Sequence, residues 1–185
     1  MVVASMSCRR SFSVRALRAP DRRFATLRTV RRSSTLCGTR LIAVTDTYRG
    51  SCLCGVVSFD VEEFQEQAAH CHCSMCRKFH GAEYATIAGV PRRAFGLVSG
   101  EDALQEYEAS NGTVRTFCRH CGSSLFFWSP KGDPDVVEVA LGVMDGVVPV
   151  APDAHIFVDS ATSWTKIADA LPRYSKGRQS DEVES

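Results

Sequence analysis

The segment Cys71-His72-Cys73-Ser74-Met75-Cys76 decides how the rest of the chain is interpreted. It places three thiols within six residues, and Arg77 and Lys78 follow directly. Zinc prefers thiolate and imidazole ligands in tetrahedral array, and this spacing allows three sulfurs to reach one ion. Three protein ligands would leave a fourth position for water or substrate, as in catalytic zinc sites. The alternative is a structural site whose fourth ligand lies elsewhere in the chain.

Other cysteines share this clustered arrangement. Seven of the nine fall into three groups: Cys52 and Cys54; Cys71, Cys73 and Cys76; Cys118 and Cys121. Clusters of the Cys-x-Cys and Cys-x-x-Cys kind are typical of metal binding in a reducing compartment, whereas disulfide frameworks spread their cysteines more evenly. The sequence therefore predicts two zinc ions per chain, one held by four thiols and one by three.

The spacing alone leaves two points open. It does not say whether the pair Cys118 and Cys121 joins the first cluster or the central one. It also does not say whether a histidine closes the three-thiol site, since structural zinc usually has four protein ligands. The candidates for that eighth ligand are His70, His72, His80 and His120.

The N-terminal segment has a different composition. Residues 1–40 hold ten arginines, no lysine and one acidic residue, Asp21, and serine and threonine are frequent. This composition is typical of an organelle transit peptide, so residues 1–45 are expected to direct the protein to mitochondria. The alternatives are a plastid or cytoplasmic location, and for the segment itself a disordered basic arm that binds nucleic acid or another polyanion. Cys8 and Cys37 fall in this segment and receive no role.

The remainder of the chain is acidic. Ten of the 22 basic and one of the 21 acidic residues lie in 1–40, so residues 41–185 carry 12 basic and 20 acidic side chains. A domain with this charge is unsuited to nucleic-acid binding through its overall field. The sequence also lacks an apolar run long enough to span a membrane.

The folded part is expected to be an all-β domain over residues 46–175, with a loose polar tail over 176–185. Short runs rich in β-branched and aromatic residues predict the strands, at 56–61, 84–88, 95–98, 104–107, 113–117, 124–128 and 136–143. Asn111-Gly112 predicts a tight hairpin. The best candidate for a helix is Ser163 to Leu171, which ends before Pro172.

Three motifs and their order resemble the glutathione-dependent formaldehyde-activating enzyme family, which includes the centromere protein V type domain. The resemblance covers about residues 48–174. The motifs are Gly50-Ser51-Cys52-Leu53-Cys54-Gly55, Cys71 to Lys78 with Gly81, and Phe117-Cys118-Arg119-His120-Cys121-Gly122-Ser123. A C-terminal pattern also matches: His155-Ile156-Phe157-Val158, Ser163-Trp164 and Asp169-Ala170-Leu171-Pro172.

This resemblance implies a β-tent fold and a division of the cysteines. Carried over, Cys52, Cys54, Cys118 and Cys121 correspond to a structural zinc site. Cys71, Cys73 and Cys76 correspond to a catalytic site with an open position. The implied activity is that of a carbon–sulfur lyase that adds a small aldehyde to glutathione, as in formation of S-hydroxymethylglutathione.

Basic side chains are expected to orient glutathione through its two carboxylates. Arg77 and Lys78 are nearest in sequence to the central cluster, and Arg115 and Arg119 could approach across the hairpin. Two other functional classes stay open. One is a non-enzymatic zinc-stabilised module that binds a protein partner, with both metals structural. The other is a thiol redox protein that uses Cys71 to Cys76 without metal.

Overall fold

The computed structural model describes residues 46–184, which form the all-β domain that the sequence predicts. Its strands are β1 (Tyr48–Ser51), β2 (Ser58–Val61), β3 (Ala68–Cys71), β4 (Ala85–Pro91), β5 (Phe95–Ser99), β6 (Leu104–Glu108), β7 (Val114–Cys118), β8 (Ser124–Trp128), β9 (Val136–Ala140) and β10 (Pro152–Ile156). Short 3-10 helices lie at Arg92–Ala94, Glu101–Ala103, Leu141–Val143 and Val158–Ser160. The one α-helix in this part of the chain is α1 (Ser74–His80). The expected N-terminal address over residues 1–45 lies outside the described residues.

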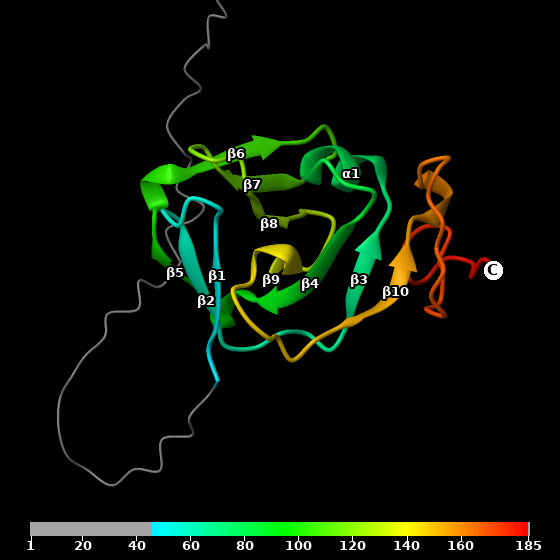
Figure 1. Ribbon diagram of the computed structural model, residues 1–185, viewed down its shortest axis with the longest axis horizontal. Coiled ribbons are helices and arrows are strands. Elements are labelled where there is room, and N and C mark those ends of the chain that lie inside the picture. Colours follow the sequence, from blue (N-terminus) through cyan, green and yellow to red (C-terminus); the bar gives the residue numbers. More distant parts are fainter. Residues whose placement is uncertain (1–45, 185) are drawn as a thin grey trace, which may run out of the picture.

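Two sheets make up the domain. The small sheet has the order β1-β2-β5, and the large sheet has the order β10-β3-β4-β9-β8-β7-β6. Neighbouring strands are antiparallel except β10, which pairs with β3 in parallel. In Figure 1 the small sheet stands at the left of the curved large sheet, and β10 lies at the right and leads into the C-terminal segment.

The main core lies between the two sheets and is aromatic. Phe59 of β2 meets Phe95 of β5 at 5.2 Å between ring centroids, and Phe126 of β8 contacts both rings edge-on. Phe59, Leu125 and Val139 are fully buried, and burial of each such side chain stabilises the fold by roughly 1.5–3 kcal/mol. This core fixes the small sheet on one face of the large one.

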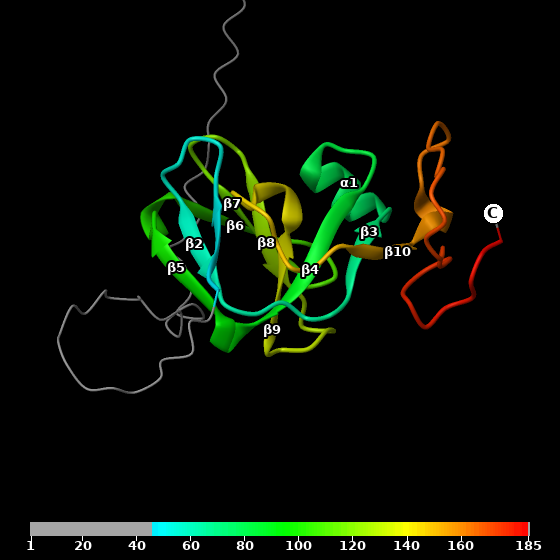
Figure 2. The same ribbon diagram turned by 60° about the horizontal axis from the view of Figure 1, so that its bottom comes forward.

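The opposite face of the large sheet carries α1. Side chains alternate between faces along a strand, so Phe127 of β8 points away from the core that holds Phe126. Arg115 of β7 is the direct neighbour of Phe127 and shares its face. Phe79 of α1 packs on the same face, with its ring centroid 6.1 Å from that of Phe117. Figure 2 shows α1 above the strands at the end of the sheet where β3 and β4 meet.

The C-terminal segment corrects one expectation. Residues 163–171 form no helix and instead run as irregular chain; Asp169 contacts His155 of β10 at 3.0 Å, and the residues that follow pair with the β10 backbone. The His155 N–H donates to the Pro172 carbonyl, and the Tyr174 N–H donates to the His155 carbonyl. The expected tail also makes contacts, since Arg178 donates to the Ala68 carbonyl at 2.7 Å and pairs with Asp153.

Within residues 46–184, no helix has the length and apolar character needed to cross a bilayer.

Candidate metal centres

The first cysteine group joins the two sheets. Cys52 and Cys54 follow β1 of the small sheet, and Cys118 ends β7 of the large sheet, with Cys121 in the turn that follows. The four sulfurs lie within 4.8 Å of one another. The sulfur of Cys54 is 3.4 Å from that of Cys52 and 3.8 Å from that of Cys118. The open question of pairing is thus resolved by geometry: the pair Cys118 and Cys121 faces the first cluster.

The turns around this group direct N–H and O–H donors at the sulfurs. Gly55 and Gly122 adopt positive φ of 74° and 78°, a conformation that favours glycine and lets each loop curl beneath its thiols. The Val57 N–H donates to the sulfur of Cys52 at 3.3 Å. The Ser123 hydroxyl lies 3.3 Å from the sulfur of Cys121 and lowers the pKa of that thiol to about 5. Such contacts stabilise thiolates, which are the form that binds metal.

The second group stands where β3 passes into α1. Cys71 is the last residue of β3, Cys73 is the N-cap of α1, and Cys76 lies in the first turn of the helix. Their sulfurs also lie within 4.8 Å of one another. The sulfur of Cys73 accepts the Cys76 N–H at 3.3 Å. The pKa of Cys73 is lowered to about 2 because the thiols of Cys71 and Cys76 donate to its sulfur, and the same contact raises the pKa of Cys71.

Among the described residues, no histidine joins either cysteine group. His70 shares a hydrogen bond with Thr86 at 2.9 Å, and His120 is exposed. His80 keeps a buried Nε2, and burial together with the nearby Arg115 charge lowers its pKa to about 4. The second group therefore has three close protein ligands in the part of the chain that the structure describes.

His72 belongs to a chain of three polar side chains. The Nε2 of His72 and the Nδ1 of His155 are 2.8 Å apart, and the Nε2 of His155 lies 3.0 Å from the Asp169 carboxylate. If His155 donates to Asp169, its Nδ1 accepts from His72. This contact also lowers the pKa of Asp169. His72 is completely buried. This series of hydrogen bonds therefore fixes the backbone between Cys71 and Cys73, where His72 is the only intervening residue.

Arg115 reaches the second group from the neighbouring hairpin. Its Nη2 donates to the sulfur of Cys76 at 3.6 Å, and its side chain is only 3% exposed. The guanidinium carbon lies 5.3 Å from the ring centroid of Phe79 and 4.8 Å from that of Phe127. Two aromatic faces therefore position a cation beside the thiols.

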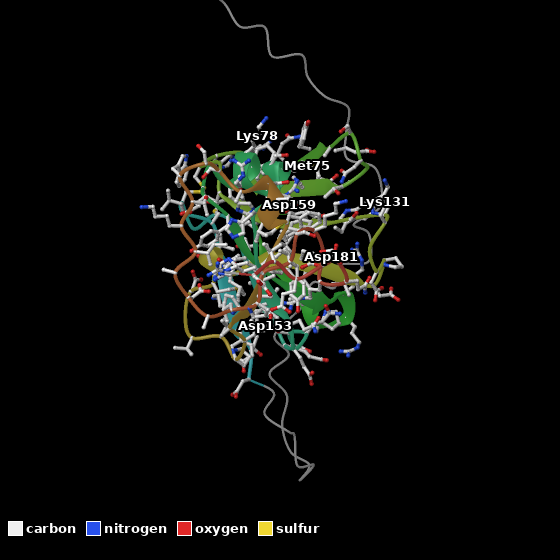
Figure 3. The ribbon with its side chains drawn as sticks, turned by 90° about the vertical axis from the view of Figure 1, so that its right-hand side faces the viewer. Met75, Lys78, Lys131, Asp153, Asp159 and Asp181 are labelled. Atoms are coloured by element: carbon white, nitrogen blue, oxygen red, sulfur yellow. The ribbon has the colours of Figure 1, made fainter. Side chains whose placement is uncertain are left out.

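The other basic candidates occupy different positions. Arg77 is partly buried and donates from Nε to the His72 carbonyl at 3.1 Å, which ties α1 to the loop between the cysteines. Lys78 is exposed and projects from α1 at one end of the molecule, as Figure 3 shows. Arg119 is exposed in the turn of the four-cysteine group. Of the four basic residues considered from sequence, Arg115 is the one that contacts a thiol of the second group.

Both groups fit a thiophilic metal ion. The donor atoms are soft sulfurs, which suit zinc and related ions better than they suit magnesium or calcium. The four-sulfur group supplies a complete tetrahedral ligand set, and the three-sulfur group supplies three of four positions. The two cysteine groups could thus hold metal ions.

Known proteins are similar to this chain in sequence. A sequence profile of the family described as "Glutathione-dependent formaldehyde-activating enzyme" matches residues 47–160. An uncharacterized lyase of Schizosaccharomyces pombe is 25% identical over 113 residues, which cover 60% of this chain and 79% of the relative. A Halomonas elongata protein, provisionally named a glutathione-dependent formaldehyde-activating enzyme, is 28% identical over 125 residues, 64% of this chain and 79% of that protein.

A solved structure also matches. The crystal structure of a Rhodobacter sphaeroides protein is 28% identical in sequence, with a TM-score of 0.47, and the match covers 55% of this chain and 91% of the other. The family profile spans more than half of the present chain and includes all seven clustered cysteines. The chain therefore belongs to the glutathione-dependent formaldehyde-activating enzyme family.

Proposed function

We propose that this protein is a zinc-dependent carbon–sulfur lyase that forms or cleaves an adduct between a thiol, such as glutathione, and a small aldehyde. Two zinc ions per chain are proposed, a structural one at the four-cysteine group and a catalytic one at the three-cysteine group. The observation that carries the proposal is the three-cysteine group, which has three close sulfurs and no histidine within reach in the described chain. The relatives' names support the same class of reaction.

The reaction needs a thiolate beside a carbonyl carbon. Zinc bound by three cysteines would lower the pKa of a substrate thiol and favour its nucleophilic form. Addition of the thiolate sulfur to the carbonyl carbon of formaldehyde forms one carbon–sulfur bond as the π bond of the carbonyl breaks. The resulting alkoxide oxygen takes up one proton, which balances the proton that the thiol released, and the product is the hemithioacetal. Arg115 places positive charge at the edge of the three-cysteine group, where this anionic chemistry would occur. The His72–His155–Asp169 chain keeps the loop between the first two cysteines in position.

The proposed activity can be measured directly. Purified protein should increase the rate at which S-hydroxymethylglutathione forms from glutathione and formaldehyde, followed by nuclear magnetic resonance exchange. Cys73→Ser, which removes one of the three sulfurs, serves as the matched control. A rate no higher than that of the uncatalysed reaction would rule out this aldehyde, and the same assay with other small aldehydes would then test the wider class.

Lys78 is the better placed of the two basic residues proposed to contact substrate, because it is exposed on α1 two residues after Cys76 whereas Arg77 binds the His72 carbonyl. Lys78→Ala should weaken binding of glutathione by about 0.5–1 kcal/mol, a modest effect because exposed ion pairs are weak. Binding of mercaptoethanol, which has no carboxylate, should not change. Isothermal titration of both thiols checks this, and an equal loss for both would contradict a role in carboxylate binding.

A further inference from the structure

Arg115 is a buried cation without an acidic partner in the described part of the chain. No carboxylate of residues 46–184 forms an ion pair with it. Its Nη2 contacts the sulfur of Cys76, while its Nε and Nη1 are buried and have no hydrogen-bond partner there. A guanidinium carries five N–H donors. The side chain thus retains donors that the protein described here does not use.

Burial of such a group is unfavourable unless negative charge lies nearby. The three-cysteine group can supply that charge when it holds a metal ion through thiolates, because the Arg115 Nη2 lies 3.6 Å from the sulfur of Cys76. Three thiolates and one divalent metal ion carry a net charge of −1. With Arg115 included, this ensemble is neutral.

The charge of the ensemble affects which ligand can bind at the fourth coordination position of the three-cysteine group. An anionic ligand there would bring the ensemble to −1 with Arg115, but to −2 without it. A neutral ligand such as imidazole would leave the charge unchanged in both cases. Repulsion between like charges is strong in a poorly solvated site, so the arginine matters for anions and much less for neutral molecules.

We propose that Arg115 makes the three-cysteine centre selective for an anionic fourth ligand, a thiolate in preference to a neutral donor. This inference rests on the proposed function, because it requires a metal ion at that centre. Arg115 acts on the ligand through its charge and its unused N–H donors and is a specificity-determining residue.

The four-cysteine group provides an internal comparison. It already has four sulfurs, and Arg119 in its turn is exposed. No buried guanidinium contacts it among the residues that the structure covers. Within residues 46–184, a buried cation is therefore found at the group with three protein ligands and not at the group with four.

The test uses the full chain with cobalt(II) in place of the native metal, since cobalt absorption reports ligand changes. Thiocyanate, mercaptoethanol and imidazole are titrated at one pH against wild type and Arg115→Met. The variant should lose affinity for thiocyanate and mercaptoethanol by roughly 10- to 100-fold, the effect of removing one contact to a charged group. Its affinity for imidazole should stay within about twofold of wild type, a difference of less than 0.5 kcal/mol.

Controls separate charge from packing. Lys131→Met removes an exposed charge from the loop after β8 and should leave all three affinities unchanged. Arg115→Lys should recover part of the anion affinity, and a failure to recover any would count against the charge argument. If Arg115→Met does not melt cooperatively, Arg115→Gln is judged by the same criterion.

The outcomes distinguish this inference from the proposed function. Equal anion affinity in wild type and Arg115→Met overturns the role of Arg115, and so does an equal loss for anions and imidazole. If wild type binds thiocyanate in an Arg115-dependent way but binds no thiol, the selectivity for anions stands, whereas the thiolate as its ligand and the proposed reaction are both overturned.

Discussion

Cys118→Ser should abolish cooperative folding of the domain, whereas Cys73→Ser should leave it largely intact. Cys118 is completely buried and belongs to the group that links the loop after β1 to the end of β7. Its sulfur lies 3.8 Å from that of Cys54, a residue 64 positions earlier in the chain. A metal ion held there closes a long loop and joins two sheets, so its loss acts on the fold as a whole.

The expected loss of stability follows from comparing the free energy of zinc binding with the total stability of a domain. Structural zinc in small domains contributes apparent binding free energies of about 10–16 kcal/mol at neutral pH. A domain of this kind is stabilised by only about 5–15 kcal/mol in total. Removal of one ligand from the four-cysteine group should therefore unfold the protein or leave it without a sharp thermal transition.

Thermal melting followed by circular dichroism, together with the metal content of each variant, measures whether the domain still folds cooperatively. Cys121→Ser should behave like Cys118→Ser, and Cys73→Ser is the matched control because it makes the same chemical change at the other group. The control should melt cooperatively with one metal ion fewer per chain. Equal loss of folding in all three variants would mean that the structural and catalytic roles are assigned incorrectly.

Local patterns in the sequence identified most strands of the fold. Runs with β-branched and aromatic residues predicted seven of the ten strands that residues 46–184 form, although the ends shifted by a few residues. The hairpin at Asn111-Gly112 is present between β6 and β7, where the Asn111 side chain accepts the Thr113 N–H at 3.1 Å. These features depend on residues close together in the chain, and sequence reasoning describes such residues well.

Elements that depend on distant partners were missed. Ala68 to Cys71 shows no alternation, because β3 is buried on most of its length between β4 and the parallel strand β10. The helix α1 has only seven residues, too few for a clear period, although Gly81 as its C-cap and the basic last turn were readable signals. The helix expected over 163–171 is wrong; the Asp169 side chain in this segment contacts His155 of β10, a partner that lies 14 residues away in the chain.

The residues of the metal centres also fall into those that local spacing predicts and those that depend on distant partners. Cysteine spacing identified all seven thiols that the structure brings into two groups. The role of Arg115 could not be inferred from spacing, because its contact with Cys76 requires the register of β7 on β8 and the packing of α1. The pairing of His155 with His72 likewise joins residues 83 positions apart.

Glutathione should alter the cobalt spectrum of the wild-type protein, and it should have no effect on the three-cysteine centre of Cys73→Ser. A thiol at the fourth position would ionise well below its usual pKa of about 8.5, so binding should release a proton at neutral pH. Thiolate-to-cobalt charge transfer should strengthen on binding, because the number of sulfur ligands rises from three to four. Cys73→Ser removes one of the three close sulfurs of the group, and the centre should then hold its metal weakly or lose it.

Two further measurements make this result decisive. Proton release, followed by a pH indicator in weak buffer, should match thiol binding in stoichiometry and concentration dependence. S-methylglutathione has the same carboxylates but no ionisable thiol, so it should leave the charge-transfer bands unchanged. If millimolar glutathione changes neither the spectrum nor the pH, the fourth position is not open to thiols, and a zinc-stabilised module that binds a protein partner becomes the better account. If glutathione binds with proton release while formaldehyde is not consumed, the centre activates thiols and a different aldehyde is its substrate.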